Sequence, residues 1–159
     1  MTRWLCLWLV GSGLLVTACG TPDPQISTTL RLDAVTAAQV KAYRVSVLPA
    51  LDRDRHQVTC ERFFCGTLAN VPLLADGSFA FDPSVTAQQE LKSIAPQKGL
   101  VVVAEAFDAA FAANGTNPGT LIAQGCTFDV EVRSKKATDV SVDLRDPLTD
   151  AQKGTICQP

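Results

Sequence analysis

Apolar residues recur at every second position over several short segments of this chain, and this alternation constrains the fold more than any other feature. Successive side chains of an extended strand point to opposite faces, so the pattern predicts strands with one buried face and one polar face. The clearest case is residues 126–132, where Thr127, Asp129 and Glu131 are expected to face outward. Residues 26–32, 43–47 and 140–144 have the same period and predict three more strands.

Other segments complete the expected sheets. Residues 100–104 are apolar on both faces, which predicts a strand at the centre of the packed structure. Phe79 and Phe81 follow an expected Asp76-Gly77 turn, and Lys98-Gly99 and Asn114-Gly115 predict further turns. The sequence therefore predicts an all-β fold, a two-sheet antiparallel β-sandwich of about seven strands. Residues 83–93 fit either one short helix or a loop followed by a strand at residues 91–95.

The first 18 residues have the features of a secretion signal, with a basic start, an apolar stretch and small residues at its end. The ending Val16-Thr17-Ala18-Cys19 resembles the lipobox of bacterial lipoproteins. This resemblance implies that residues 1–18 are removed as a signal peptide and that Cys19 carries a lipid that anchors the chain in the membrane. Gly20 in place of aspartate implies, in the same family pattern, the outer membrane. The alternative is an ordinary secretory signal followed by a chance cysteine.

Beyond the signal, residues 19–25 are interpreted as a lipid-anchored spacer and residues 26–159 as a single β-sandwich domain. Residues 91–108 and 119–126 resemble the later strands of transthyretin-like and immunoglobulin-like sandwich modules of bacterial surface proteins, in which a Pro-Gly turn feeds a strand that ends in Asp. The resemblance implies the fold and identifies no functional residue.

Four cysteines remain in this domain, an even number that predicts two disulfides outside the cytosol. Three pairings of Cys60, Cys65, Cys126 and Cys157 are possible. We favour Cys60–Cys65 with Cys126–Cys157, because the first pair is close in sequence and the second would hold the C-terminal tail. Zinc is disfavoured because no histidine stands beside these cysteines, and no metal or cofactor is expected.

The net charge and the small number of histidines argue against several functions. The net charge is -2 and basic residues are scattered, so no nucleic-acid partner is expected. His56 is the only histidine and belongs to the charged run of residues 51–57, which predicts a solvated loop rather than a catalytic base. Glu105, beside apolar neighbours, is the best candidate for a carboxylate catalyst, although an outward-facing strand residue is the simpler interpretation. We therefore expect no catalytic residue.

The segment between Cys60 and Cys65 is the best candidate for binding. If these cysteines pair, Arg62, Phe63 and Phe64 are displayed on a tied loop, a composition typical of interface hot spots; the alternative is that one or both phenylalanines pack into the core. The sequence predicts a non-enzymatic, lipid-anchored envelope protein, a structural or protein-interaction module whose partners are the membrane, through Cys19, and an envelope protein. The alternatives are a small-ligand or carbohydrate-binding module and a carboxylate-based hydrolase.

Overall fold

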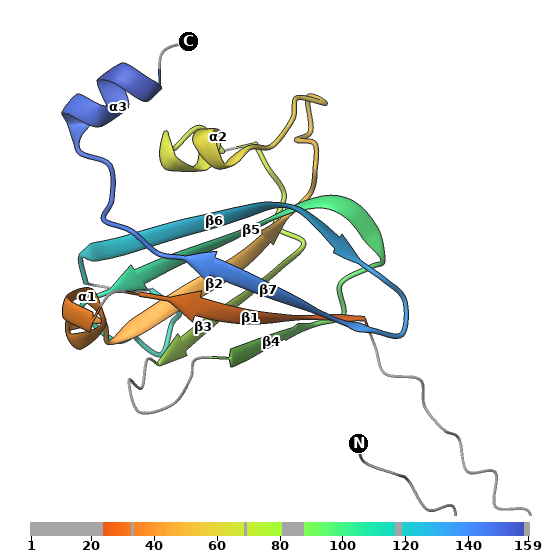
Figure 1. The fold of residues 1–159 in the computed structure, drawn as a ribbon, viewed down its shortest axis with the longest axis horizontal. Coiled ribbons are helices and arrows are strands. Elements are labelled where there is room, and N and C mark those ends of the chain that lie inside the picture. The colour runs from red at the N-terminus through yellow and green to blue at the C-terminus, as the bar shows by residue number, and fades with distance from the viewer. Residues whose placement is uncertain (1–23, 33, 69, 81–87, 117–118, 158–159) are drawn as a thin grey trace, which may run out of the picture.

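Seven strands form two sheets that pack face to face (Figure 1). The computed structural model describes residues 24–32, 34–68, 70–80, 88–116 and 119–157. One sheet has the order β4-β1-β7 and the other β3-β2-β5-β6. The strands are β1 (Gln25–Arg31), β2 (Ala42–Leu48), β3 (Ala75–Ala80), β4 (Gln88–Lys92), β5 (Gln97–Phe107), β6 (Leu121–Val132) and β7 (Ala137–Asp143).

The alternation that predicted these strands places the main core between the sheets. Ile26, Thr28 and Leu30 of β1 are buried, as are Tyr43 and Val45 of β2. Residues 100–104 of β5 are buried on both faces, as expected for a central strand. The predicted sandwich is therefore confirmed, with one difference: β1 and β7 pair in parallel, while the other strand pairs are antiparallel.

Three short helices are described: α1 (Ala34–Gln39), α2 (Cys60–Phe64) and α3 (Asp150–Ile156). The alternative of a helix near 83–93 is wrong for residues 88–92, which form β4. In β4, Leu91 is buried and pairs in register with Ile26, so it completes the edge of the three-stranded sheet. Residues 81–87 lie outside the described residues. No helix in the described part of the chain is long and apolar enough to cross a membrane.

Two expected turns are parts of strands. Asp76-Gly77 lies inside β3, where a Cβ at Gly77 would clash with the Phe79 ring, so close packing explains this glycine. Lys98-Gly99 lies in β5, where the register with β6 shifts between Gln97 and Leu100. The left-handed conformation of Gly99, with φ +72°, accommodates that irregularity.

The sheets are joined along β6 and β7. The Thr127 hydroxyl donates to the Ser141 carbonyl at 2.7 Å, and Thr138 donates to the Glu131 carbonyl at 3.1 Å. A Cβ at Gly125 would lie 2.5 Å from the Asp143 carbonyl oxygen, so only glycine permits this close approach. These contacts close one side of the sandwich and fix the position of β6, which carries part of the candidate site.

Candidate functional site

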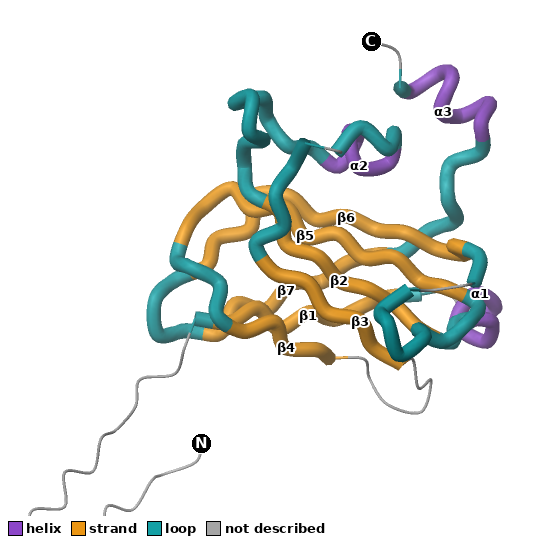
Figure 2. Tube along the Cα trace, turned by 180° about the vertical axis from the view of Figure 1, so that it is seen from behind, coloured by secondary structure: helices purple, strands orange, loops and turns teal. Residues whose placement is uncertain are grey.

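An irregular cover lies on the outer face of the four-stranded sheet. It consists of the segment between β2 and β3, which contains α2, and Figures 1 and 2 show α2 above the sheets on the side of β6. Beneath it lies a second buried cluster, formed by Leu48, Val58, Val101 and Val103. The second apolar face of β5 is therefore buried by this cover rather than by another sheet.

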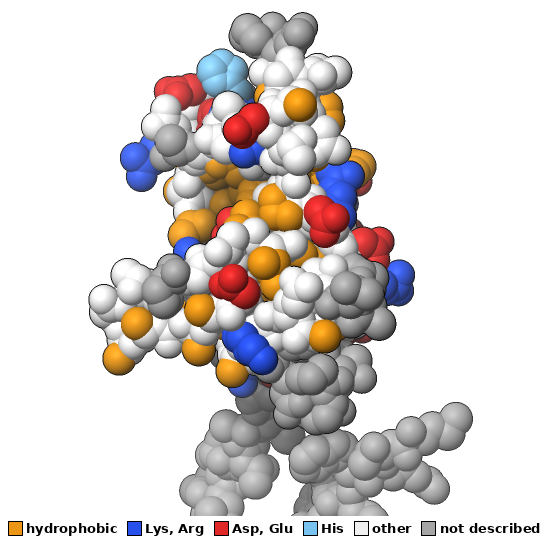
Figure 3. All heavy atoms as spheres, turned by 90° about the vertical axis from the view of Figure 1, so that its left-hand side faces the viewer, with side chains coloured by type: hydrophobic (Ala, Val, Ile, Leu, Met, Phe, Trp, Pro, Cys, Tyr) orange, Lys and Arg blue, Asp and Glu red, His pale blue; other side chains and the backbone are white. Residues whose placement is uncertain are grey.

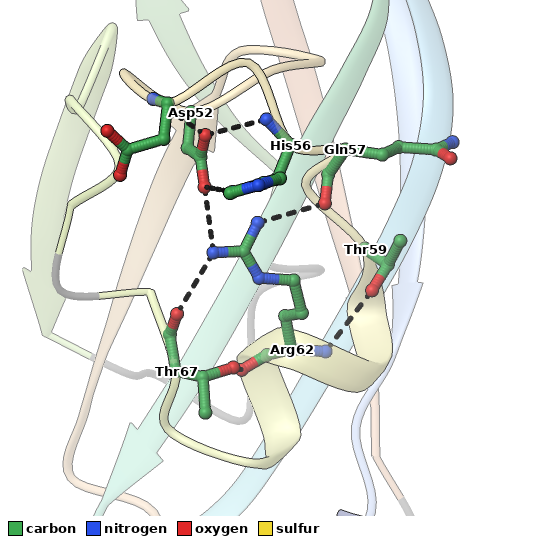
Figure 4. A network of polar contacts seen from close by, with 7 residues as sticks. Asp52, His56, Gln57, Thr59, Arg62 and Thr67 are labelled. Carbon is green, nitrogen blue, oxygen red and sulfur yellow. Dashed lines mark hydrogen bonds and ion pairs between the residues drawn. The ribbon is translucent and has the colours of Figure 1, made fainter. Parts of the chain in front are cut away.

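Arg62 of α2 holds the cover together from inside. Its guanidinium forms an ion pair with Asp52 at 2.9 Å and donates to the carbonyls of Gln57 at 3.0 Å and Thr67 at 3.3 Å. Figure 4 shows the guanidinium between these three groups. Helix α2 begins at this position because the Thr59 hydroxyl accepts a hydrogen bond from the Arg62 backbone N–H at 3.2 Å.

Asp52 is the acceptor at the centre of this network. Its side chain is 1% exposed, and one carboxylate oxygen accepts hydrogen bonds from the backbone N–H groups of Asp54 at 2.9 Å and His56 at 2.8 Å. Burial alone would raise the pKa of Asp52, but the hydrogen bonds from His56, Arg62 and Asp54 outweigh it and hold the pKa below its usual value. The carboxylate therefore stays charged and fixes the turn at residues 52–56.

The same turn brings together three groups that can ligate metals. Oxygen or nitrogen atoms of Asp52, Asp54 and His56 all lie within 4.8 Å of one another. However, the Arg62 guanidinium already neutralises Asp52, and a cation bound there would face that positive charge. The arrangement is therefore assigned a structural role. The His56 side chain is 74% exposed, as the solvated-loop interpretation predicts, whereas Asp52 in the same run is buried.

Two disulfides fasten α2 at both ends, and the pairing favoured from the sequence is wrong. Cys60 is bonded to Cys126 of β6, and Cys65 to Cys157 after α3. Five residues of an α-helix turn through about 500°, so Cys60 and Cys65 point in directions about 140° apart. One side chain therefore faces the sheet and the other faces the C-terminal tail.

The corrected pairing changes the predicted contact patch, because Arg62, Phe63 and Phe64 do not lie on a loop closed by Cys60 and Cys65. Arg62 binds within the cover, and Phe63 packs against the second cluster. The Phe64 ring lies under the Arg145 guanidinium at 4.2 Å. Both phenylalanines are half-buried: Phe63 leans on the second cluster, and Phe64 lies at the surface beside Arg145.

An apolar groove opens where this cover meets β5 and β6. Its volume is about 670 Å³, and its lining includes Leu51, Val58, Val101, Phe128, Glu61 and Asp129. Phe128 is 71% exposed and Leu51 is 47% exposed. A smaller hollow of about 330 Å³ shares Phe128 and includes Phe64 and Arg145. On the side shown in Figure 3, hydrophobic side chains are also visible in a hollow between the upper part of the molecule and the sheets.

Phe128 is a candidate binding residue that sequence reasoning missed. The alternation of residues 126–132 predicts that it faces inward. Val102 pairs with Thr127 but Leu100 pairs with Val130, so Phe128 and Asp129 stand opposite one residue of β5. This bulge, with Asp129 at φ +57°, reverses the alternation and turns Phe128 outward. The only sequence signal is the aspartate itself, a residue type that tolerates positive φ.

The groove has charges of one sign at its rim. Glu61 and Asp129 are the charged residues among those that line it. Of the basic residues near in sequence, Arg62 binds Asp52 and Lys98 pairs with Glu131 at 3.5 Å, while Arg53 and Arg55 are exposed and do not line the groove. The groove therefore combines an apolar floor with an acidic rim.

Glu105 lies elsewhere on the same face of the four-stranded sheet. It pairs in register with Arg44 of β2 and Gln124 of β6, so neither neighbour across the strands is an acid. Burial raises the pKa of Glu105, and the positive charge of Arg44 opposes that shift. A carboxylate hydrolase needs a second converging acid, which these strand neighbours do not supply.

Comparison of the chain with protein-family models, curated proteins and solved structures found no match. The lipobox and sandwich-module resemblances therefore stay predictions, and function must be argued from the groove itself.

Proposed function

We propose that this chain is a non-enzymatic, lipid-anchored protein of the cell envelope whose sandwich is a protein-interaction module. Its groove takes an apolar segment of a partner protein that is flanked by basic residues. The observation that carries the proposal is the exposed Phe128 on a groove of about 670 Å³. Large aromatic side chains that stay exposed beside an apolar concavity are typical of interaction sites.

The charge of the rim supports a basic partner. Apolar contact would come from Leu51 and Phe128, and the carboxylates of Glu61 and Asp129 would attract lysine or arginine side chains on either side of the bound segment. The fixed position of the groove also favours binding, because the disulfide from Cys60 to Cys126 holds its walls together before a partner arrives.

The envelope location rests on other support. Val16-Thr17-Ala18-Cys19 supplies the acylation pattern, and Gly20 favours the outer membrane. Disulfides persist in oxidising compartments, and the domain contains two. Mass spectrometry of the N-terminal peptide, from protein purified from membranes, tests the anchor: an acylated N-terminal Cys19 supports it, and an unmodified cysteine contradicts it.

The groove is tested with short synthetic peptides that share a Leu/Phe core and differ only in Lys or Glu flanks. We expect the Lys-flanked peptide to bind at least about tenfold more tightly, and Phe128→Ser to weaken its binding by at least about tenfold. The matched control is Leu73→Ser, since Leu73 is 57% exposed and does not line the groove. Equal binding of the two peptides, or equal effects of the two substitutions, would contradict the proposal.

A small-ligand module is the second candidate, favoured by the groove volume, which lies within the range of small-molecule sites. A neutral apolar dye such as Nile red distinguishes the two. Dye binding that Phe128→Ser abolishes, together with no binding of either peptide, would replace the first proposal with the second.

A further inference from the structure

We infer that the end of the sandwich where β1 begins is a docking surface for anionic lipid headgroups. This inference rests on the lipid anchor at Cys19 in the proposed function. Here "the basic end" means the end that carries Lys92, Lys98, Arg133, Lys135 and Lys136.

Strand register gathers these residues around the start of β1. Gln25 pairs with Lys92, the last residue of β4, and with Ala137, the first residue of β7. Gln97, the first residue of β5, pairs with Val132, the last residue of β6. The turn between β6 and β7 therefore lies at the same end as the start of β1 (Figure 1), and it carries three of the five basic residues.

The lysines of the chain are concentrated at this end. Six lysines occur in the sequence, and the other two are Lys41, directly before β2, and Lys153, in α3. Because β2 runs antiparallel to β5, Lys41 lies near Phe107, at the opposite end of the sandwich. This asymmetry arises in a chain whose net charge is -2.

Acidic neighbours neutralise only part of the basic end. Glu90 pairs with Lys92 at 3.8 Å, and Glu131 is shared by Lys98 at 3.5 Å and Arg133 at 2.8 Å. Asp139 stands near the start of β7. Among the ion pairs of the described residues, none involves Lys135 or Lys136, and both side chains are exposed. With Asp129, which lies three residues before the end of β6, this end carries five basic and four acidic groups and keeps a small positive excess.

The tether brings this end to the membrane. Gln25 follows Cys19 by six positions, and a fully extended chain spans about 20 Å at most over that distance. A lipid on Cys19 would therefore hold the basic end close to the headgroups. Each basic side chain near an anionic surface raises the membrane association constant about fivefold, and this attraction fades within a Debye length of the surface.

The test uses the acylated full mature chain, reconstituted in phosphatidylcholine vesicles and in vesicles where about one lipid in three is phosphatidylglycerol. An amine-reactive reagent labels the lysines, and peptide mass spectrometry gives the rate at each position. With phosphatidylglycerol we expect labelling of Lys135 and Lys136 to slow at least about threefold and to recover at high salt, while Lys41 and Lys153 keep their rates. Equal changes at all four lysines would overturn the inference.

A paired variant separates this surface from the anchor. Lys135→Gln with Lys136→Gln should remove the protection of Lys98 by phosphatidylglycerol, whereas Lys41→Gln with Lys153→Gln should leave it intact. Both pairs are exposed, so folding is expected to persist. Acylated Cys19 with unprotected lysines would overturn the docking surface and leave the anchor standing. Unmodified Cys19 would overturn the anchor, and with it this inference.

Discussion

Removing the two disulfides separately should give unequal losses of stability, although chain entropy treats them almost equally. The bridges Cys60–Cys126 and Cys65–Cys157 span 66 and 92 residues, which correspond to about 4.4 and about 4.6 kcal/mol at 25 °C. In each variant the remaining bridge already shortens the loop that the missing bridge would close. The expected entropic contribution of each bridge is therefore about 3–4 kcal/mol.

The native state makes the two cases differ. Cys60–Cys126 joins α2 to β6 beside the buried Val101 and Val103, so the cover stays packed when both cysteines are replaced by serine. Only the unfolded chain then gains conformational entropy, so we expect the free energy of unfolding to fall by about 3–4 kcal/mol. Helix α3 has no buried residue, so without Cys65–Cys157 the tail is freed in the native state as well. The conformational entropy gained by the native tail offsets the entropy gained by the unfolded chain. The free energy of unfolding should therefore fall by less than about 1 kcal/mol.

Urea unfolding of the two double-serine variants, followed by circular dichroism without reductant, measures both free energies. Hydrogen exchange of residues 150–156 then shows whether α3 is released in Cys65→Ser/Cys157→Ser. Equal losses of stability, or α3 amides that stay protected without their bridge, would refute the reasoning, because α3 would then be held by packing.

Three further predictions concern single side chains. The hydrogen bonds that lower the pKa of Asp52 stabilise the fold above about pH 4, and this stabilisation is lost as pH falls through the folded-state pKa. The unfolding free energies of Asp52→Asn and of the parent chain should therefore differ at neutral pH and converge in acid. The raised pKa of Glu105 makes stability fall as pH rises above about 4.3, so Glu105→Gln should gain stability relative to the parent at neutral pH and not in acid, as measured by thermal unfolding. At the bulge, Asp129→Val should cost about 1–2 kcal/mol in urea unfolding because a β-branched residue resists positive φ, whereas Asp129→Gly should change stability by less than about 0.5 kcal/mol.

Sequence alternation predicted the strands because burial between two sheets repeats at every second residue. It placed Ile26 and Leu30 of β1 and Tyr43 of β2 in the core, where the structure has them. It failed for Cys126 and Phe128, because the bulge at Asp129 places these earlier residues on the face opposite to Val130 and Val132, which lie in the main core as the alternation predicts. A one-residue shift reverses the facing of every later side chain, and residue types alone do not reveal where the register of the partner strand changes.

The disulfide pairing failed for a different reason. Nearness in sequence favoured Cys60–Cys65, but α2 separates their side chains by about 140° around its axis. That helix is five residues long and has no buried residue, so no apolar period indicates it. Its only sequence signal is Thr59 at the N-cap, a residue common in loops as well.

The outer cover explains why the binding groove is harder to predict than the fold. The apolar character of Val101 and Val103 shows that the second face of β5 must be buried, but the segment that buries it contains the charged run of residues 51–57. That run is compatible with packing because Arg62, from another part of the cover, neutralises Asp52 inside it. The groove begins where this non-periodic cover ends against the bulge that exposes Phe128. Both walls of the proposed site therefore depend on contacts between distant residues, and a periodic pattern records only the local ones.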